Sequence, residues 1–319
     1  SDLLLQRRAV VSMAFRAALN NLAFQAFYSR QNQRKMDHQL KHVLITGANE
    51  GIGKATAMAL AKKGFAVIMA CRNMEKAEAA LAEIKNGSGN SNVELLPLDL
   101  SDLNSVQKAA RLYRERYTRL DVLLNNAGII TSVLEKTAQG FERQFGVNHL
   151  GHYLLTRLLL DMVQAAPEPR IVNVSSHLHY RRKLDFGTLR GENADSYDGI
   201  NAYGQSKLAN ILFTRELARR YPGIACNALH PGVVRTRFGN KPGSFYSPFW
   251  TLFKPFLVTV EKGARTSVLL ASDASVAGVT GKYFWPRMGA RYPSRTAQNP
   301  ELALQLWDWS EEAVKEWLV

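Results

Sequence analysis

The sequence predicts a single α/β domain whose centre is a Rossmann-type, doubly wound parallel sheet of about seven strands, with helices on both faces. From Lys41 onward, short apolar segments alternate regularly with segments of helical character. The apolar segments are nearly continuous rather than alternating with polar residues, which is typical of strands covered on both faces. No internal repeat and no long linker interrupts the pattern, so we expect one domain over residues 41–319.

Six strand-and-helix units follow one another along the chain. The first strand is expected at residues 42–46, before a glycine cluster and a helical stretch at 54–64. The second is expected at 65–70 and leads into a long helix that reaches Lys85. The polar residues 101–105 open the third helix, and a later helix carries Tyr203. The other four strands are expected at residues 92–100, 121–128, 169–176 and 224–232.

Composition excludes several classes of protein. The net charge of +14 is spread along the chain without a basic run interleaved with aromatics, so we expect no nucleic-acid partner. The charge suits solubility, an anionic surface or an anionic cofactor. Cys71 and Cys226 lie in apolar runs and are expected to be buried thiols in a reducing compartment. The seven histidines are scattered, so no metal site is expected, and no 20-residue segment is free of charge.

Residues 1–40 differ from the rest of the chain. Between Leu3 and Met36 there is no acidic residue, whereas arginine and lysine recur and apolar residues follow a helical period. This pattern is typical of an organelle-targeting segment. It also suits a helix that lies on an anionic membrane or docks on a partner, and an unstructured extension is a further alternative. We therefore treat residues 1–40 as a separate basic amphipathic extension.

A glycine-rich loop follows the first expected strand. Glycines allow the backbone to turn tightly and to approach a pyrophosphate, whose charge is stabilised at the N-terminus of the following helix. The position of the loop between the first strand and the first helix predicts a dinucleotide-binding site. Its candidate contact residues are Gly47, Asn49, Glu50, Gly51, Ile52 and Gly53.

The end of the second strand bears on the choice of cofactor. An acidic residue there would accept hydrogen bonds from the adenosine ribose, whereas an arginine would bind a 2′-phosphate. Cys71 is followed by Arg72 and Asn73, which favours NADP(H) over NAD(H). Glu50 argues the other way, because a basic residue in the glycine loop would have helped to bind the extra phosphate.

Tyr203 and Lys207 are the candidate proton-transfer pair. Their spacing of four residues places both side chains on one face of a helix. A nearby ammonium stabilises a phenolate, so we expect the pKa of Tyr203 to fall below its ordinary value of about 10. A tyrosine of that kind can give and take a proton near neutral pH. Such pairs are also common on solvated helix faces, so the interpretation depends on the surrounding motifs.

Seven motifs occur in one order along the chain. They are TGANEGIG at 46–53, LDL at 98–100, NNAG at 125–128, VNHLGH at 147–152, VSS at 174–176, YGQSK at 203–207 and HPGVVRT at 230–236. Together they resemble the short-chain dehydrogenase/reductase family over residues 41–318. Finer features resemble the retinol dehydrogenase branch, which reduces retinal and lipid aldehydes. These are ACRN at 70–73, the stretches 140–160 and 207–217, EKGARTS at 261–267 and GKYF at 281–284.

The resemblance implies catalytic roles for four residues. Tyr203 would pass a proton to the carbonyl oxygen, and Lys207 would lower the pKa of Tyr203 and hold the nicotinamide ribose. Ser176, rather than Ser175, would hydrogen-bond to the substrate oxygen. Asn148 would anchor a water that links Lys207 to solvent. His149 and His152, in the same motif as Asn148, are expected to be structural.

The resemblance also implies further cofactor contacts. Asp99 and Leu100 would lie beside the adenine. The ribose would contact Asn126, Ala127 and Gly128, and the nicotinamide would contact Pro231, Val234 and Thr236.

The segment from residue 237 to 260 is expected to cover the substrate. It is rich in aromatic residues and poor in charge, which predicts an apolar carbonyl substrate. The same residues would also suit contact with lipid, or packing within the protein or a dimer. The resemblance adds the expectation of a homo-oligomer. Because the branch often begins with a membrane anchor and this chain has a basic amphipathic segment, we expect an organelle, with the mitochondrion first and the endoplasmic reticulum surface or a plastid as alternatives.

The sequence thus predicts an NADP(H)-dependent oxidoreductase that interconverts a lipophilic aldehyde or ketone, such as retinal, and its alcohol. One alternative keeps the site but assigns it steroid, quinone or pigment carbonyls. Another is a cofactor-binding accessory or structural subunit of a larger assembly.

Overall fold

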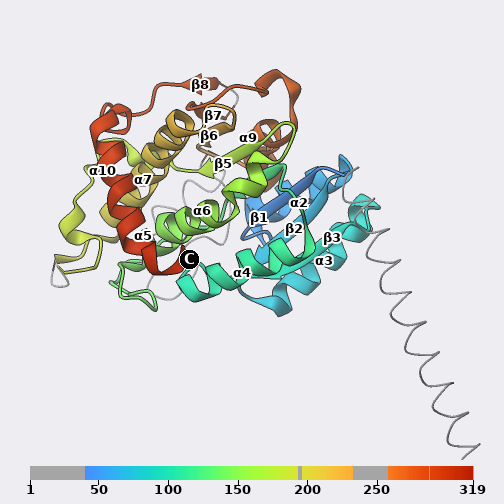
Figure 1. Ribbon diagram of the computed structural model, residues 1–319, viewed down its shortest axis with the longest axis horizontal. Coiled ribbons are helices and arrows are strands. Elements are labelled where there is room, and N and C mark those ends of the chain that lie inside the picture. Colours follow the sequence, from blue (N-terminus) through green and yellow to red (C-terminus); the bar gives the residue numbers. More distant parts are fainter. Residues whose placement is uncertain (1–39, 193–195, 233–257, 287, 319) are drawn as a thin grey trace, which may run out of the picture. The chain divides into compact units, whose positions relative to one another are not determined.

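An eight-stranded sheet forms the centre of the described protein, in the order β3-β2-β1-β4-β5-β6-β7-β8 (Figure 1). The computed structural model describes residues 40–192, 196–232, 258–286 and 288–318, so the amphipathic extension lies outside the described residues except for Leu40. The strands are β1 (His42–Thr46), β2 (Ala66–Cys71), β3 (Val93–Pro97), β4 (Val122–Asn125), β5 (Arg170–Val174), β6 (Ala225–Leu229), β7 (Tyr283–Trp285) and β8 (Gly289–Arg291).

The predicted doubly wound parallel sheet is confirmed. Every neighbouring pair from β3 to β7 is parallel, and only the short β8 is antiparallel, to β7. β1, β2, β4, β5 and β6 are buried along their whole length, as their continuous apolar sequences predicted.

Helices cover both faces of this sheet. One apolar core lies between the sheet and α2, α3 and α9, and the other lies between the sheet and α4, α6, α7 and α10. The helices are α2 (Gly51–Lys62), α3 (Met74–Ser88), α4 (Leu103–Arg116), α5 (Arg143–Phe145), the π-helix η1 (Gly146–Leu150), α6 (Gly151–Gln164), α7 (Gly199–Arg220), α9 (Val260–Ser272) and α10 (Pro300–Val314). Short 3₁₀ turns are η2 (His177–His179), η3 (Phe186–Thr188), η6 (Ala274–Val276), η7 (Thr296–Gln298) and η8 (Lys315–Trp317).

Side-chain caps fix where most of the long helices begin. Asn73 accepts the Lys76 N–H at the start of α3, and Asp102 accepts the Asn104 N–H at the start of α4. Asp198 caps α7 in the same way. Such caps satisfy backbone N–H groups that have no partner within the helix. α2 differs, since no side chain caps it and no acidic residue lies in its first turn.

The strand order makes a topological switch point between β1 and β4. The chain runs from β1 outward to β3 and then returns to pair β4 with β1 on its other side. Connections therefore leave these two neighbouring strands in opposite directions, and ligands of such sheets bind at the carboxyl ends of these strands. Thr46 ends β1 there, and Asn125 ends β4.

Both edges of the sheet are short or interrupted. β8 has three residues, all exposed, and ends at Arg291. At the other edge, β3 carries Glu94, which pairs with Arg116 at 3.7 Å, and ends at Pro97.

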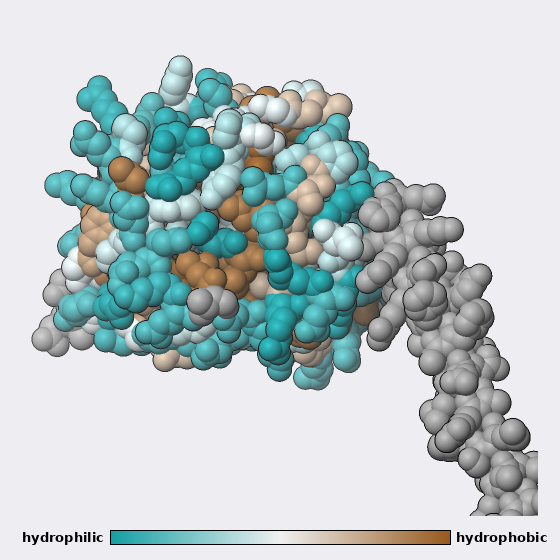
Figure 2. Space-filling view, viewed as in Figure 1, coloured by the Kyte–Doolittle hydropathy of each residue, from teal (hydrophilic) through white to brown (hydrophobic). Residues whose placement is uncertain are grey.

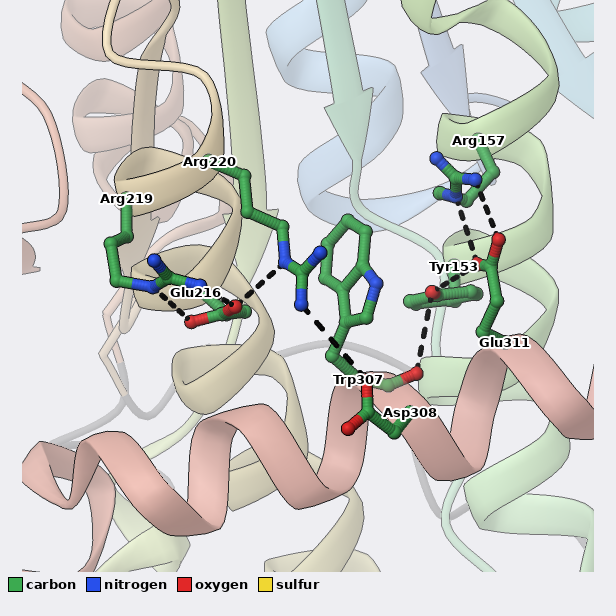
Figure 3. A network of polar contacts seen from close by, with 8 residues as sticks. All are labelled: Tyr153, Arg157, Glu216, Arg219, Arg220, Trp307, Asp308 and Glu311. Carbon is green, nitrogen blue, oxygen red and sulfur yellow. Dashed lines mark hydrogen bonds and ion pairs between the residues drawn. The ribbon is translucent and has the colours of Figure 1, made fainter.

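Helix α10 is fastened to α6 and α7 by a polar and aromatic network (Figure 3). Trp307 is buried, and the guanidinium carbons of Arg157 and Arg220 lie 5.4 and 4.4 Å from its ring centroid. Glu311 accepts hydrogen bonds from Arg157 at 2.6 Å and from the Tyr153 hydroxyl at 2.6 Å. These contacts join α10 to α6 and to α7, the helix that packs at the carboxyl end of β5.

The described surface is largely hydrophilic in one view, with apolar side chains gathered near the middle (Figure 2). Within the described residues, no helix is both long and apolar enough to span a bilayer.

Candidate active site

The glycine loop and the start of α2 form an open cradle of backbone N–H groups. Gly47 and Gly51 have φ values of 66° and 56°, a region that favours glycine. A Cβ on Gly53 would lie 2.3 Å from the carbonyl oxygen of Gly47, so only glycine fits there. With no side chain capping the helix, the first N–H groups of α2 are available to a phosphate. The residues present therefore fit a dinucleotide.

Arg72 lies just beyond the carboxyl end of β2, where a 2′-phosphate would be recognised. Its side chain is about half exposed, at 49%, and its guanidinium is 3.9 Å from the Asp99 carboxylate. An ion pair this long and this exposed is weak, so Arg72 can turn to another anion. The neighbouring Cys71 is a free thiol whose pKa is raised to about 11 by burial.

Three other predicted cofactor contacts have structural partners of their own. Asn73 caps α3, and the Asp99 carboxylate accepts the Ser101 N–H at 2.9 Å and the Ser101 hydroxyl at 2.6 Å. Leu100 is buried against Gly151. A Cβ added to Gly151 would lie 2.7 Å from the Leu100 carbonyl oxygen. Glu50 is exposed at the start of α2 and makes no capping hydrogen bond.

Tyr203 and Lys207 are both buried on α7, beside the carboxyl end of β5. The Lys207 Nζ lies 5.6 Å from the centroid of the Tyr203 ring and donates to the Val174 carbonyl at 3.1 Å. Burial lowers the pKa of Lys207 to about 7, because a charged ammonium loses its hydration there. Lys207 is therefore poised to exchange a proton near neutral pH.

The expected direction of the Tyr203 pKa is wrong for the protein without nucleotide. Burial raises the pKa of Tyr203 to about 12, and a side-chain hydrogen bond with Ser176 opposes this rise. Lys207 does not offset the burial, because the lysine itself loses charge near pH 7. Tyr203 thus keeps its proton at neutral pH, which is the form that donates to a carbonyl oxygen.

The structure distinguishes the two serines that follow β5. The Ser175 hydroxyl is buried and donates to the Lys207 carbonyl oxygen at 2.7 Å, so it fastens β5 to α7. Ser176 lies beside Tyr203 and accepts the Leu178 N–H at 3.2 Å. Of the two, Ser176 has its hydroxyl next to the phenol.

Asn148 lies in the π-helical turn η1, between α5 and α6. Its amide nitrogen donates to the Ile129 carbonyl at 3.0 Å and to the Ser206 hydroxyl at 2.9 Å, and its amide oxygen accepts the Ile129 N–H at 2.7 Å. A π-turn inside a helix is uncommon and is often found at functional sites. Asn148 thereby connects the loop after β4 to α7.

Gly128 lies where the cofactor loop and the proton-transfer pair meet. A Cβ there would be 3.2 Å from the Lys207 Nζ and 3.3 Å from the Asn148 Oδ1. On the other side of the segment, Asn126 donates to the Thr46 carbonyl at 2.8 Å. Residues 126–129 therefore join the glycine loop to Lys207, as a shared site for cofactor and catalysis requires.

Two predicted nicotinamide contacts, Val234 and Thr236, lie outside the described residues, as does most of the aromatic segment. Pro231 is described and follows β6 at the same edge of the sheet as Ser176. Among the described residues, no three His, Cys, Asp or Glu side chains are grouped as metal ligands.

Three further side chains shape the site: Thr46 and Ser206, to which sequence reasoning gave no role, and His152, which it expected to be structural. Thr46 accepts the N–H groups of Asn126 and Ala127 at 2.9 Å each, and Ser206 joins Asn148 to the Tyr203 carbonyl. His152 contacts Thr46 at 2.8 Å. The position of His152 four residues after Asn148, on one helix face, was the available signal.

Comparisons with known proteins agree with this site. Residues 41–245 match the family model described as short chain dehydrogenase. The chain is 43% identical over 285 residues to retinol dehydrogenase 13 of Homo sapiens, with 86% of this chain and 84% of that protein covered. It is also 43% identical to retinol dehydrogenase 12 of Mus musculus, with 85% of each chain covered.

Two solved structures extend the comparison. An uncharacterised protein from Mycobacterium paratuberculosis superposes with a TM-score of 0.70 at 35% identity, covering 86% of this chain and 93% of that one. A short-chain dehydrogenase from Shigella flexneri, complexed with NADP, has a TM-score of 0.63 at 26% identity, covering 77% of this chain and 97% of that one. With its motifs, its sheet and these relatives, the chain belongs to the short-chain dehydrogenase family, in the branch of the retinol dehydrogenases.

Proposed function

We propose that this protein is an NADP(H)-dependent oxidoreductase that interconverts a lipophilic, retinal-like aldehyde or ketone and its alcohol. The observation that carries the proposal is the buried Tyr203, with Ser176 hydrogen-bonded to it and Lys207 one helical turn away. Of these groups, Lys207 lies beside Gly128, and Asn126 at the start of the same segment is hydrogen-bonded to Thr46 before the glycine loop.

The chain's own residues supply proton transfer and orientation. In the direction of reduction, the Tyr203 O–H donates its proton to the substrate oxygen as negative charge develops there. The Ser176 hydroxyl stabilises the same oxygen, and Lys207, with its pKa of about 7, passes a proton back to the phenolate. The bound nicotinamide supplies the hydride in this direction and accepts it in the other.

The preference for NADP(H) rests on Arg72. No acidic residue ends β2, and the half-exposed guanidinium of Arg72 makes a long contact, 3.9 Å, with the Asp99 carboxylate. Solved relatives from Shigella flexneri and Escherichia coli are complexed with NADP and NADPH, which supports the same choice. The residues of the glycine loop and the 126–129 segment would hold the rest of the dinucleotide.

The lipophilic substrate is supported by side chains around Ser176. His177 packs edge-on against Trp285 at 5.1 Å between ring centroids, and Tyr180 lies 4.9 Å from His177. These rings form an aromatic cluster around the residues that directly follow Ser176 in the chain, and the names of the relatives give retinol, a lipophilic alcohol, as their substrate. A homo-oligomer, and an organelle such as the mitochondrion reached through residues 1–40, complete the proposal.

The decisive experiment measures NADPH oxidation with a panel of retinoid, aliphatic, steroid and quinone carbonyls. We expect the wild type to reduce retinal-like aldehydes. The Tyr203→Phe variant should bind NADPH normally but lose activity by at least about a hundred-fold, because only the proton donor is removed. Equal turnover in the two proteins would contradict the assignment of Tyr203. NADPH binding without turnover of any carbonyl would favour an accessory subunit instead.

A further inference from the structure

The segment of residues 126–129, expected to contact the cofactor ribose, is fixed at both ends by side chains. At its start, the N–H groups of Asn126 and Ala127 both donate to the Thr46 hydroxyl oxygen at 2.9 Å. At its end, the backbone of Ile129 exchanges two hydrogen bonds with the Asn148 amide, at 2.7 and 3.0 Å. The position of the segment therefore depends on where Thr46 and Asn148 stand relative to each other.

His152 connects these two anchors. Its Nε2 lies 2.8 Å from the Thr46 Oγ1, and its Nδ1 lies 3.1 Å from the Asn148 carbonyl oxygen. Thr46 belongs to β1, whereas Asn148 and His152 belong to η1 and α6. The imidazole thus joins the central strand to the π-helical turn and closes a ring of hydrogen bonds around residues 126–129.

The partners of His152 assign its tautomer. A carbonyl oxygen can only accept, so the proton is on Nδ1. Thr46 Oγ1 already accepts two N–H groups, so its own proton is directed to Nε2, which accepts it. A charged imidazole would present a second donor to Thr46 and break the ring. Burial lowers the pKa of His152 to about 3, so the imidazole is neutral near pH 7.

We propose that His152 is a positioning residue, which sets the 126–129 segment for nucleotide binding by holding Thr46 and Asn148 in fixed register. This inference rests on the proposed function, because that function assigns the segment to the cofactor. His152 does not contact the reacting atoms. It acts through the backbone of residues 126–129 and through Asn148. Its loss therefore weakens cofactor binding while the fold is kept.

His149 provides a matched control in the same motif. It is fully buried, and its pKa is likewise lowered to about 3 by burial. Its Nε2 lies 3.1 Å from the Ser310 hydroxyl of α10, and it also interacts with the Asn210 side chain of α7. A loss of stability common to both histidines can therefore be separated from an effect on the nucleotide site.

Three substitutions of His152 dissect its two hydrogen bonds. His152→Gln places an amide oxygen near the position of Nε2 and keeps the acceptor for Thr46. His152→Asn places an amide nitrogen near the position of Nδ1 and keeps the donor to the Asn148 carbonyl. His152→Phe fills the space and keeps neither. His149→Phe is the control.

Each protein is tested by NADPH titration, by the urea midpoint of unfolding and by hydrogen–deuterium exchange of peptides that contain residues 126–129. We expect His152→Phe and His152→Asn to bind NADPH about ten-fold more weakly, since Thr46 loses its acceptor. His152→Gln should stay within about three-fold of the wild type. Hydrogen–deuterium exchange in the 126–129 segment should rise in His152→Phe and His152→Asn, with or without nucleotide. It should not rise in His149→Phe.

The inference is overturned if all three His152 variants behave like His149→Phe, with a lower urea midpoint but unchanged NADPH affinity and exchange. The Gln and Asn variants decide the matter even if His152→Phe does not fold. Exchange measured without nucleotide is independent of turnover. If the protein reduces no carbonyl, the proposed function is refuted. The exchange data still test the role of His152.

Discussion

Gly128 and Lys207 approach so closely that a methyl group on the glycine would lie 3.2 Å from the lysine Nζ. This contact brings the loop after β4 against the buried amine of α7, and a methyl group at Gly128 would fit only if Lys207 or Asn148 moved by a few tenths of an ångström. The nitrogen cannot withdraw freely, because it is buried and bonded to the Val174 carbonyl.

We therefore expect Gly128→Ala to displace Lys207 by a few tenths of an ångström and to lower kcat/KM at least about ten-fold, since small misplacements at a reacting centre are costly. The free energy of unfolding should fall by only about 1–2 kcal/mol. Gly223→Ala is the control, because no atom lies within 4 Å of its Cβ position. Equal kinetics in the two variants would show that the contact does not position Lys207.

Substitution of Arg72 should change cofactor preference. Arg72→Asp replaces the cation that faces a 2′-phosphate with an anion, so the ratio of kcat/KM for NADPH to that for NADH should fall at least ten-fold, or by about 1.4 kcal/mol. Arg111→Asp makes the same charge change at an exposed position on α4 and should leave the ratio unaltered. An unchanged ratio in Arg72→Asp would mean that another group reads the phosphate.

The buried Lys207 should make stability rise with pH in the nucleotide-free protein. Its folded pKa of about 7 lies below the ordinary lysine value near 10.4, so between these values the unfolded chain binds more protons. The contribution of this group to the free energy of unfolding should therefore increase by about 2 kcal/mol from pH 7 to pH 9, while the buried thiols of Cys71 and Cys226, with raised pKa values, act in the opposite direction. The lowered pKa values of His149 and His152 act only below pH 7.

Lys207→Met keeps the length and burial of the side chain and should abolish that rise. The comparison is made by urea unfolding of both proteins at pH 7 and pH 9, and the difference between them isolates Lys207, because the cysteines and tyrosines titrate alike in both. A parallel pH dependence would indicate that the amine stays charged in the folded state.

Helix α10 should contribute strongly to stability through Trp307. Trp307→Ala removes a buried ring that Arg157 and Arg220 both approach, and should lower the free energy of unfolding by about 3–5 kcal/mol. Leu304→Ala on the exposed side of the same helix should change it by less than about 1 kcal/mol. Thermal and urea unfolding measure both variants, and comparable losses would show that α10 is not anchored by this ring.

The sheet was predictable because each of its central strands has a continuous apolar sequence. Continuous apolar runs such as residues 42–46 can only be buried on both faces, and the order of helices between them leaves few topologies. β8 was not predictable, since Gly289, Ala290 and Arg291 are all exposed and show no apolar pattern. It forms only because β7 supplies a partner for its backbone.

The site was predictable in its residues and less so in its electrostatics. Motif order indicated Ser176, Tyr203 and Lys207, but the direction of the Tyr203 pKa depends on burial, which spacing does not reveal. The π-turn around Asn148 has no local sequence signature, and the contacts made there, by Asn148 with Ile129 and by His152 with Thr46 of β1, are distant in sequence.

The two edges of the sheet have a consequence for how the protein behaves at high concentration. An unpaired strand edge is a template on which another chain can add a strand, and long apolar edges lead to aggregation. β8 offers only three residues and ends in a charge, while β3 presents Glu94 and a proline that has no N–H to donate. In the described part of the chain, both sheet edges therefore disfavour the addition of a strand from a neighbouring molecule at high concentration.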